Sequence, residues 1–595
     1  MYPEGARRNQ WMVRMYEMHA MTPGPLAAAR AALAADRAAA DPAIWIARLS
    51  DDAILAHAHV LENEGPRGRP LWGLTFAVKD NIDVAGMPTT AACPEFAHTP
   101  AVSAPAVSRL LDAGALLLGK TNLDQFATGL VGTRSPYGVP RNVFSAAHVP
   151  GGSSSGSAVA VAAGIADIAL GTDTAGSGRV PAGFGNIVGL KPTIGSISAA
   201  GMVPACPSLD TISVFARTVD AAMMAQRVIA GYDAADPYSR PPPFDHLRRA
   251  GLAPAARIAV ADTGSLCDPE VTRLYRRAAD LFTKGLFNTG LFTTNTVDLA
   301  PFLAIARLLY DGPWVAERTA SLREIVTHRP GILHPVTRAI VEGGLTRKTV
   351  DAFDAFHALA RARRLISGLF ADHDALLVPT APFCPTLAEL KADPIGPNAR
   401  LGTFTNFVNL CDLAAIAVPA GFGADGLPVG VTVLGPAWSE GRLAAIADHI
   451  HRAFTPGLPP PLPAEALAAD ETALFCIGAH MSSLPLNQQI TGFGGRFLRE
   501  ARTQPVYRLH ALGNRPGMAR GAAGAAIAGE VWALPTAAIG ALLALVPPPL
   551  GFGTVALEDG PCLGFLAETA ALEGTPDITV HGGWRAWLAA RGETT

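Results

Sequence analysis

Apolar and polar residues alternate along the first three quarters of the chain in blocks whose lengths suit strands and helices. Short, nearly uninterrupted apolar runs predict buried strands, and helical spacing predicts helices between them. The expected strands lie at residues 75–78, 115–120, 168–170, 257–260 and 375–379, and two more lie within 414–435 on either side of a turn at 424–428. The expected helices lie at 107–112, 155–165 and 350–370, and two more lie within 24–62, joined around Asp41 and Pro42. This alternation predicts an α/β domain in which helices flank a central mixed β-sheet and functional loops lie at the strand ends.

The composition changes most sharply at residues 455–463, which read Thr-Pro-Gly-Leu-Pro-Pro-Pro-Leu-Pro. Proline-rich segments form semi-rigid connectors, so we expect a domain boundary here. The larger domain is expected to cover residues 1–455, with N-terminal helices at 24–62 and a core at 71–450. A linker at 456–471 then leads to a small α+β domain at 472–595, which has shorter strands and many glycine and proline turns.

The charge balance excludes several classes of protein. The chain has 595 residues, of which 49% are hydrophobic and 16% charged, and its formal net charge is −3. A near-neutral balance offers no basic surface for nucleic acid or for a membrane, and the low charge predicts a large buried core. Seven isolated cysteines predict reduced thiols. The first residues lack the apolar region of a signal peptide, so a cytoplasmic protein is expected. Met1 and Met21 are both reasonable first residues.

Three short motifs suggest the chemistry. They are Val-Lys-Asp at residues 78–80, Gly-Gly-Ser-Ser-Ser-Gly at 151–156 and Gly-Thr-Asp-Thr-Ala-Gly-Ser at 171–177. A serine nucleophile needs a base within hydrogen-bond reach, and none of the 15 histidines lies in a nucleophile-elbow motif. Taken singly, a lysine after a strand or a Gly-Ser loop is more often structural. Taken together, they favour a serine hydrolase whose base is a lysine.

The region from about residue 71 to 435 resembles the amidase signature family. The matching motifs lie at residues 76–80, 119–126, 151–155, 171–177, 189–193, 418–421 and 426–430. The resemblance implies that Ser177 attacks an amide carbonyl and that Ser153, after a cis bond to Gly152, passes the proton to Lys79. It implies an oxyanion hole of backbone amides and no metal or organic cofactor. The residues of that hole would be Thr174, Ala175, Gly176 and Ser177.

The implied mechanism places demands on its neighbours. Lys79 must be neutral to act as a base, so burial must lower its pKa, and Asp80 must point elsewhere. Asp173 and Arg179 are expected to hold the turn that carries Ser177.

Two segments point to the substrate. Residues 126–138 depart from the pattern of the glutamine-using members and resemble allophanate hydrolases, and Gly129 in this segment is expected to leave room for the substrate. Residues 309–318 resemble the segment whose tyrosine and arginine hold allophanate, here Tyr310 and Arg318. An arginine fork matches a carboxylate, and on one regular helix the two side chains would lie roughly 80° apart. The alternative for Arg318 is a surface salt bridge with Glu317 or Asp311.

The last 125 residues or so resemble the second domain of allophanate hydrolases, which is similar in fold to γ-glutamylcyclotransferases. The glutamate of a cyclotransferase is missing from the corresponding stretch at 543–549. The family assigns this domain the decarboxylation of N-carboxycarbamate, for which His480 is the candidate; the alternatives are a structural histidine and a scaffolding or dimerising domain.

Together these resemblances imply an allophanate hydrolase of urea degradation that releases ammonia and N-carboxycarbamate, and then CO2. They also imply a homodimer and a functional link to a separate biotin-dependent urea carboxylase, because no biotin-carrier sequence lies in the chain. Two alternatives stay open. One is a hydrolase for another small amide, such as malonamate or a carbamate; the other is a glutamine-using subunit that supplies ammonia to a larger assembly.

Overall fold

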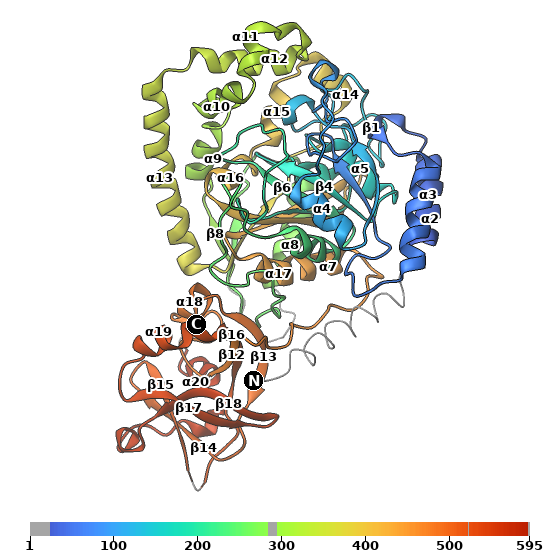
Figure 1. Cartoon of the computed structure of the whole chain (residues 1–595). Coiled ribbons are helices and arrows are strands. Elements are labelled where there is room, and N and C mark those ends of the chain that lie inside the picture. The colour runs from blue at the N-terminus through green and yellow to red at the C-terminus, as the bar shows by residue number, and fades with distance from the viewer. Residues whose placement is uncertain (1–23, 284–293, 522, 593–595) are drawn as a thin grey trace.

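The computed structural model describes residues 24–283, 294–521 and 523–592 and has a larger and a smaller body (Figure 1). The start of the expected first domain and the alternative first residue Met21 lie outside the described residues. No helix in the described part of the chain is both long and apolar enough to cross a bilayer.

An eleven-stranded mixed sheet forms the centre of the larger body. Its strands are, in spatial order, β1 (Trp45–Arg48), β3 (Leu116–Thr121), β2 (Thr75–Lys79), β4 (Ile168–Asp173), β6 (Thr211–Ala216), β5 (Val188–Lys191), β10 (Leu413–Phe422), β11 (Pro428–Pro436), β9 (Ala375–Pro379), β7 (Ile258–Ala261) and β8 (Thr294–Val297). Strand β2 runs parallel to β3 and β4, whereas β4 runs antiparallel to β6. The predicted mixed sheet is therefore confirmed, and the carboxyl ends of β2 and β4 meet at the same edge.

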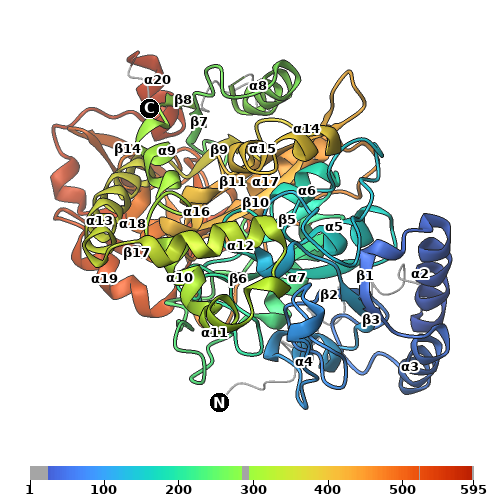
Figure 2. The same ribbon diagram turned by 90° about the horizontal axis from the view of Figure 1, so that it is seen from above.

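Helices cover both faces of this sheet (Figure 2). Successive residues of β2 show why: Phe76 and Val78 belong to one apolar core and Ala77 to another, since side chains alternate along a strand. The helices are α2 (Pro25–Ala39), α3 (Asp51–Glu64), α4 (Pro105–Asp112), α5 (Ser155–Ala162), α6 (Val180–Phe184), α7 (Val219–Ile229), α8 (Pro269–Thr283), α9 (Ala300–Arg307), α10 (Trp314–Ser321), α11 (Arg323–His328), α12 (Pro335–Glu342), α13 (Thr349–Asp372), α14 (Leu387–Ala392), α15 (Gly396–Leu401), α16 (Asn406–Leu410) and α17 (Glu440–Phe454).

The connection between the first two helices differs from the prediction. Residues 40–50 do not simply join α2 to α3 but contain β1, an edge strand that pairs antiparallel with β3. Asp41 caps a short 3-10 turn by accepting from the amide of Ala43 at 3.2 Å, and the indole of Trp45 donates to Asp36 at 2.8 Å. A strand of four half-buried residues is too short to show a detectable alternation of apolar and polar residues in the sequence.

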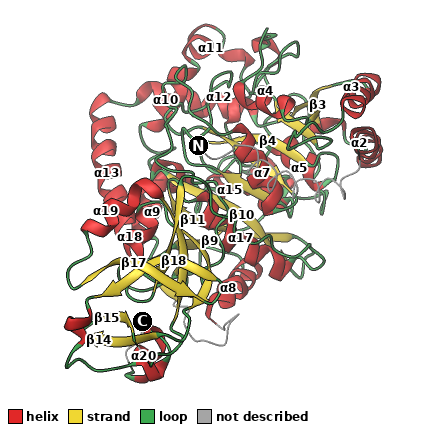
Figure 3. Ribbon diagram, turned by 60° about the horizontal axis from the view of Figure 1, so that its bottom comes forward, coloured by secondary structure: helices red, strands yellow, loops and turns green. Residues whose placement is uncertain are grey.

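The smaller body contains a five-stranded sheet and a two-stranded ribbon (Figure 3). The strands of the sheet are, in spatial order, β13 (Arg496–Arg502), β16 (Ala528–Pro535), β12 (Glu471–Cys476), β18 (Gly560–Ala567) and β17 (Leu550–Leu557). The ribbon consists of β14 (Tyr507–Leu512) and β15 (Arg515–Arg520). The helices are α18 (Asn487–Gly492), α19 (Ile539–Ala544) and α20 (Trp584–Ala590). The proline-rich residues 455–470, which lie between α17 and β12, contain no helix or strand.

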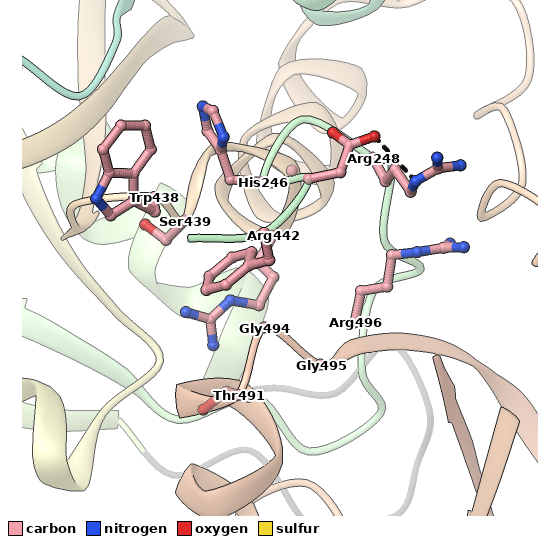
Figure 4. A pocket seen from close by; sticks show the side chains of 12 residues that line it. His246, Arg248, Trp438, Ser439, Arg442, Thr491, Gly494, Gly495 and Arg496 are labelled. Atoms are coloured by element: carbon pink, nitrogen blue, oxygen red, sulfur yellow. Dashed lines mark ion pairs between the residues drawn. The ribbon is translucent and has the colours of Figure 1, made fainter. Parts of the chain in front are cut away.

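Polar contacts tie the connecting segment and the smaller body to the larger body. Glu465 accepts from both terminal nitrogens of Arg227 at 2.7 and 3.0 Å. Arg496 binds both oxygens of Glu471 and also donates to the carbonyl of Arg249 in the larger body at 3.2 Å. Arg496 also lines a small cavity, drawn in Figure 4. Its volume of about 20 Å³ gives room for one water molecule. Among its lining residues are His246, Trp438, Arg442, Thr491 and Gly494.

Candidate active site

Lys79 and Ser153, which are 74 positions apart in the sequence, are in direct contact. The Lys79 ammonium nitrogen Nζ, at the end of β2, donates to Ser153 Oγ at 2.7 Å and to Thr172 Oγ1 at 2.6 Å. Thr172 belongs to β4, so the pairing of β2 with β4 brings it to the lysine. The peptide bond between Gly152 and Ser153 is cis, as the family resemblance implies.

Lys79 meets the electrostatic requirement of a base. The side chain is fully buried, and burial lowers its pKa to about 7 although Asp124, Asp210 and Asp173 act in the opposite direction. Asp80 points away: it lies 3.2 Å from Lys120 and accepts a hydrogen bond from the amide of Thr90 at 2.9 Å. Burial therefore makes the unprotonated form of Lys79 accessible near neutral pH.

The turn that carries Ser177 is held by Asp173. This buried carboxylate accepts from the amides of Gly176 at 2.8 Å and Gly178 at 3.0 Å, and it pairs with Arg179 at 2.9 Å. Gly176 has a φ of +127°, and a Cβ atom there would collide with the hydroxyl of Thr405 in the loop before α16. Only glycine fits at this position, and the ion pair expected between Asp173 and Arg179 is present.

The amides expected to form the oxyanion hole are not equally available. The amide of Gly176 is already bonded to Asp173, whereas we find no hydrogen bond from those of Thr174, Ala175 or Ser177 to the described residues. The Thr174 hydroxyl donates to Asp210, whose other oxygen accepts from two further backbone amides. Burial raises the pKa of Asp210 to about 6. Three amides therefore remain for a developing oxyanion.

Tyr310 and Arg318 meet, although not in the way that the sequence suggested. Tyr310 lies in the turn after α9 and Arg318 lies in α10, so the angle expected on a single helix is wrong. The chain turns at Gly312, where a Cβ atom would collide with the carbonyl of Leu308. The guanidinium carbon of Arg318 nevertheless lies 5.7 Å from the centre of the Tyr310 ring. The two side chains therefore lie close together, as predicted, but the turn between α9 and α10 brings them together and not their spacing on a single helix.

Arg318 is buried and only partly satisfied. Its Nη1 donates to Thr128 Oγ1 at 2.8 Å and to the carbonyl of Ala127 at 3.3 Å, but its Nη2 has no partner among the described residues. Glu317 does not form the alternative salt bridge, because it accepts from the amide and the hydroxyl of Ser208 at 2.8 and 2.7 Å. The charge of Arg318 also acts to lower the pKa of Lys79, after the larger effect of burial.

Gly129 follows Thr128, which binds Arg318, in a loop that wraps around Asp124. A Cβ atom at Gly129 would approach Asp124 Oδ2 to 2.6 Å. Asp124 accepts from the amides of Gly132 and Arg134 at 2.9 Å each, and its own amide donates to the carbonyl of Ser153 at 3.0 Å. The absence of a side chain at Gly129 therefore allows the loop to pack against the residue that supports Ser153.

Sequence reasoning missed four residues of this cluster. Thr172 binds the base, Thr128 orients Arg318, Asp124 supports the serine loop and Asp210 anchors Thr174. The first three lie inside segments already singled out as motifs, so a search for polar neighbours of the catalytic candidates would have found them. Asp210 lies outside every motif, and only the pairing of β4 with β6 brings it near.

His480 lies in the smaller body, where burial lowers its pKa. Its ring stacks on Phe565 with centres 4.7 Å apart, and its Nε2 meets Gln489 Oε1 at 2.9 Å. Because an amide oxygen only accepts, Nε2 carries the hydrogen and Nδ1 is an acceptor in the neutral ring. Nearby, the buried Glu530 accepts from the Ser482 amide at 2.7 Å and pairs with Arg585 at 2.7 Å.

Comparisons with known proteins agree with this division into two bodies. A family model described as amidase matches residues 30–444, and a model described as allophanate hydrolase C-terminal domain matches residues 472–589. The urea amidolyase of Saccharomyces cerevisiae is 40% identical over 582 residues, which cover 91% of this chain and 31% of that protein. The chain thus spans about a third of the length of the first curated relatives it matches.

Two further relatives define how far the likeness extends. The solved allophanate hydrolase of Kluyveromyces lactis has a TM-score of 0.74 and 36% identity, with 98% of this chain and 99% of that one covered. A glutamyl-tRNA(Gln) amidotransferase subunit from Synechococcus is 36% identical over 410 residues, which are 64% of this chain and 84% of that protein. The likeness to the first extends through both bodies, whereas that to the second covers about two thirds of the chain. The chain therefore belongs to the amidase family and carries an allophanate hydrolase C-terminal domain.

Proposed function

We propose that the chain hydrolyses allophanate, the carboxylated form of urea. The observation that carries the proposal is the Nη2 of Arg318, a buried guanidinium nitrogen that has no partner among the described residues, while Nη1 is bonded to Thr128. A buried donor without a partner costs free energy, so the site favours a ligand that supplies an anionic oxygen. Allophanate carries such a carboxylate next to an amide, and Tyr310 lies beside the arginine to add a hydroxyl donor.

The proposed reaction begins at Ser177. Its oxygen attacks the terminal amide carbonyl of allophanate while Ser153 takes its proton and passes one to the neutral Lys79. The amides of Thr174, Ala175 and Ser177 stabilise the tetrahedral oxyanion, and Gly176 supports their turn through Asp173. The C–N bond then breaks, the leaving nitrogen takes the proton back as ammonia, and a Ser177 acyl-enzyme remains.

Water completes the turnover. It attacks the acyl-enzyme, the same relay removes its proton, and N-carboxycarbamate leaves. This product loses CO2 to give carbamate, which decomposes to ammonia and a second CO2. The smaller domain, which we take to be γ-glutamylcyclotransferase-like without cyclotransferase activity, would promote this loss. We propose His480 as its contact with the carboxylated product, where Nδ1 of the protonated ring would donate a hydrogen bond to the leaving carboxylate while Nε2 stays bonded to Gln489.

The wider context is part of the same proposal. The domains are expected to divide at 1–455, 456–471 and 472–595, and the enzyme is expected to act in the cytoplasm as a homodimer. Two curated relatives are named urea amidolyase, and this chain covers 31% of each. We therefore propose a functional link to a separate biotin-dependent urea carboxylase, which would supply allophanate.

Ammonia release from allophanate by the purified chain tests the proposal. Ser177→Ala should abolish release. Arg318→Ala should raise KM about 10- to 100-fold, because a hydrogen bond to a charged group is worth about 1.5–3 kcal/mol. Arg217→Ala, which removes an exposed arginine paired with Asp167, is the matched control and should leave KM unchanged. Release that persists in Ser177→Ala would rule out the nucleophile.

Parallel assays with malonamate, a carbamate and glutamine separate the alternatives. Turnover of an uncharged amide with no response to Arg318→Ala would support a different small-amide hydrolase. Glutamine turnover would favour the ammonia-supplying subunit, to which the amidotransferase relative corresponds. For the smaller domain, His480→Asn should leave the first equivalent of ammonia unchanged and delay CO2, whereas an unchanged ratio of CO2 to ammonia would argue for a scaffolding role.

A further inference from the structure

Residues 205–210 form a tight loop that leads into β6. The amides of Leu209 and Asp210 both donate to the carbonyl of Cys206 at 2.9 Å, so the loop is closed by its own backbone. The antiparallel pairing of β6 with β4 places the end of this loop beside the start of the turn that carries Ser177. Loop 205–210 is therefore a neighbour of the proposed nucleophile, although it lies outside every motif of the sequence.

Two buried side chains fix loop 205–210 to that turn. One oxygen of Asp210 accepts from two amides of its own loop, and the other accepts from the hydroxyl of Thr174. The side-chain amide of Asn409 donates to the carbonyls of Leu209 at 3.0 Å and Asp173 at 2.9 Å. Both Asp210 and Asn409 are buried, so water does not compete for these bonds. The loop and the turn of the nucleophile are therefore held as one unit.

The same loop is also joined to α10, the helix that carries Arg318. Both oxygens of Glu317 are occupied by Ser208, whose amide donates at 2.8 Å and whose hydroxyl donates at 2.7 Å. The thiol of Cys206 adds a contact with the carbonyl of Trp314 at 3.6 Å. Consecutive residues of a helix point about 100° apart, so Glu317 can hold the loop while Arg318 points elsewhere.

The proposed substrate makes strict demands on this connection. A single nitrogen separates the carboxylate of allophanate from the amide carbonyl that is attacked, and the molecule is planar and rigid. Such a substrate cannot bend to correct an error in the distance between Arg318 and Ser177. A misplacement of about 1 Å in a reacting group can reduce a rate about 100-fold. The position of α10 relative to the turn of the nucleophile must therefore be fixed.

We propose that Glu317 is a positioning residue that fixes the carboxylate contact at Arg318 relative to the carbonyl attacked by Ser177. It acts through Ser208 and loop 205–210, and it does not touch the substrate. The inference rests on the proposed function and adds to it the residue that aligns the two ends of the substrate. Selectivity for a carboxylated amide would then depend on a glutamate that cannot itself bind a carboxylate.

Kinetics of ammonia release from allophanate test the role of Glu317. Glu317→Ala removes both bonds to Ser208 and should lower kcat about 10- to 100-fold. KM should change little, because Arg318 still binds the carboxylate but holds it in the wrong place. Glu317→Gln keeps an acceptor for the Ser208 amide and offers a donor to its hydroxyl, so it should restore most of the lost kcat. Glu324→Ala is the matched control and should match the wild type, since Glu324 lies on the next helix with its side chain 86% exposed.

Covalent labelling of Ser177 separates positioning from a general loss of structure. A fluorophosphonate reacts with an activated serine and carries no carboxylate, and mass spectrometry follows the modification. Glu317→Ala should be labelled at the wild-type rate, because Asp210 still holds the turn of the nucleophile. Labelling that falls together with turnover would overturn the positioning role.

The remaining outcomes are also decisive. An unchanged kcat in Glu317→Ala would overturn the inference alone, and a Glu317→Gln variant as slow as Glu317→Ala would assign the effect to the charge of Glu317 and not to its bonds. A wild type that releases no ammonia from allophanate would instead refute the proposed function, and this inference with it.

Discussion

Replacing Thr172 by valine tests how the proposed base is oriented. A neutral lysine amine has two N–H groups and one lone pair, and the lone pair must point at the Ser153 hydroxyl to accept its proton. One N–H therefore needs another acceptor, and Thr172 Oγ1 lies 2.6 Å from Nζ. Valine has nearly the same shape but offers no acceptor, so Thr172→Val leaves the packing intact and frees the amine to rotate.

The expected loss follows from the burial of both partners. Lys79 is 0% exposed and Thr172 2% exposed, so water cannot replace the missing acceptor. A buried donor left without a partner costs about 1–3 kcal/mol, which corresponds to a decrease of about 5- to 150-fold in kcat/KM. The hydroxyl also stabilises the ammonium form, so its removal should lower the pKa of Lys79 below about 7.

A pH profile of ammonia release distinguishes this effect from a general loss of structure. The plateau of kcat/KM at high pH should fall. The rising limb of the profile should move to lower pH, because a Lys79 with a lower pKa loses its proton at a lower pH. Thr432→Val is the matched control, since it also removes a buried threonine hydroxyl from the same sheet, one that bonds only to Thr380 at 2.8 Å. A Thr172→Val plateau within twofold of the wild type, with the limb unmoved, would refute the orienting role.

Three further measurements follow from the site. In the wild type, kcat/KM should rise tenfold per pH unit below about pH 7 and level off above it, because Lys79 acts only when unprotonated; a profile flat through pH 7 would contradict this. Arg318→Lys should raise KM about tenfold with little change in kcat, since an ammonium cannot bind two oxygens as a planar fork does; an unchanged KM would exclude the carboxylate contact. Asp173→Asn should destabilise the protein by about 3–5 kcal/mol by leaving Arg179 buried without its counter-charge, measured as a lower melting temperature in calorimetry; an unchanged melting temperature would show that the pair contributes little.

The sequence allowed most of the sheet to be predicted because its strands are nearly uninterrupted apolar runs. The run at 375–379 became β9, and the pair around the turn at 424–428 became β10 and β11. Strand β1 could not be predicted, because an edge strand of four half-buried residues is defined by its partner β3 and not by its own composition. Local patterns indicate burial, whereas edge strands depend on tertiary pairing.

The same distinction applies to the site. Lys79 and Ser153 were identified from motifs, and the structure brings them within 2.7 Å. The proximity of Tyr310 and Arg318 was predicted from their spacing on one helix, which is the wrong reason. The helix is interrupted near Gly312, where the backbone comes close to Leu308, and residue spacing does not reveal this contact. Asp210 was not predicted at all, since its contact with Thr174 exists only when β4 and β6 are paired.

In the proposed mechanism, the burial of Lys79 away from water is itself a catalytic component. No neighbouring cation dominates the lowered pKa; burial does, so the basicity of Lys79 is set by the absence of water around it. If water entered and the pKa returned to 10.5, only about one lysine in 3,000 would be unprotonated at pH 7, far fewer than with the lowered pKa of the buried site. Hydration alone would then silence the enzyme with every catalytic atom still present. The close packing that buries Lys79 thus contributes to the rate by excluding solvent, and substitutions that loosen this packing should reduce activity before they unfold the chain.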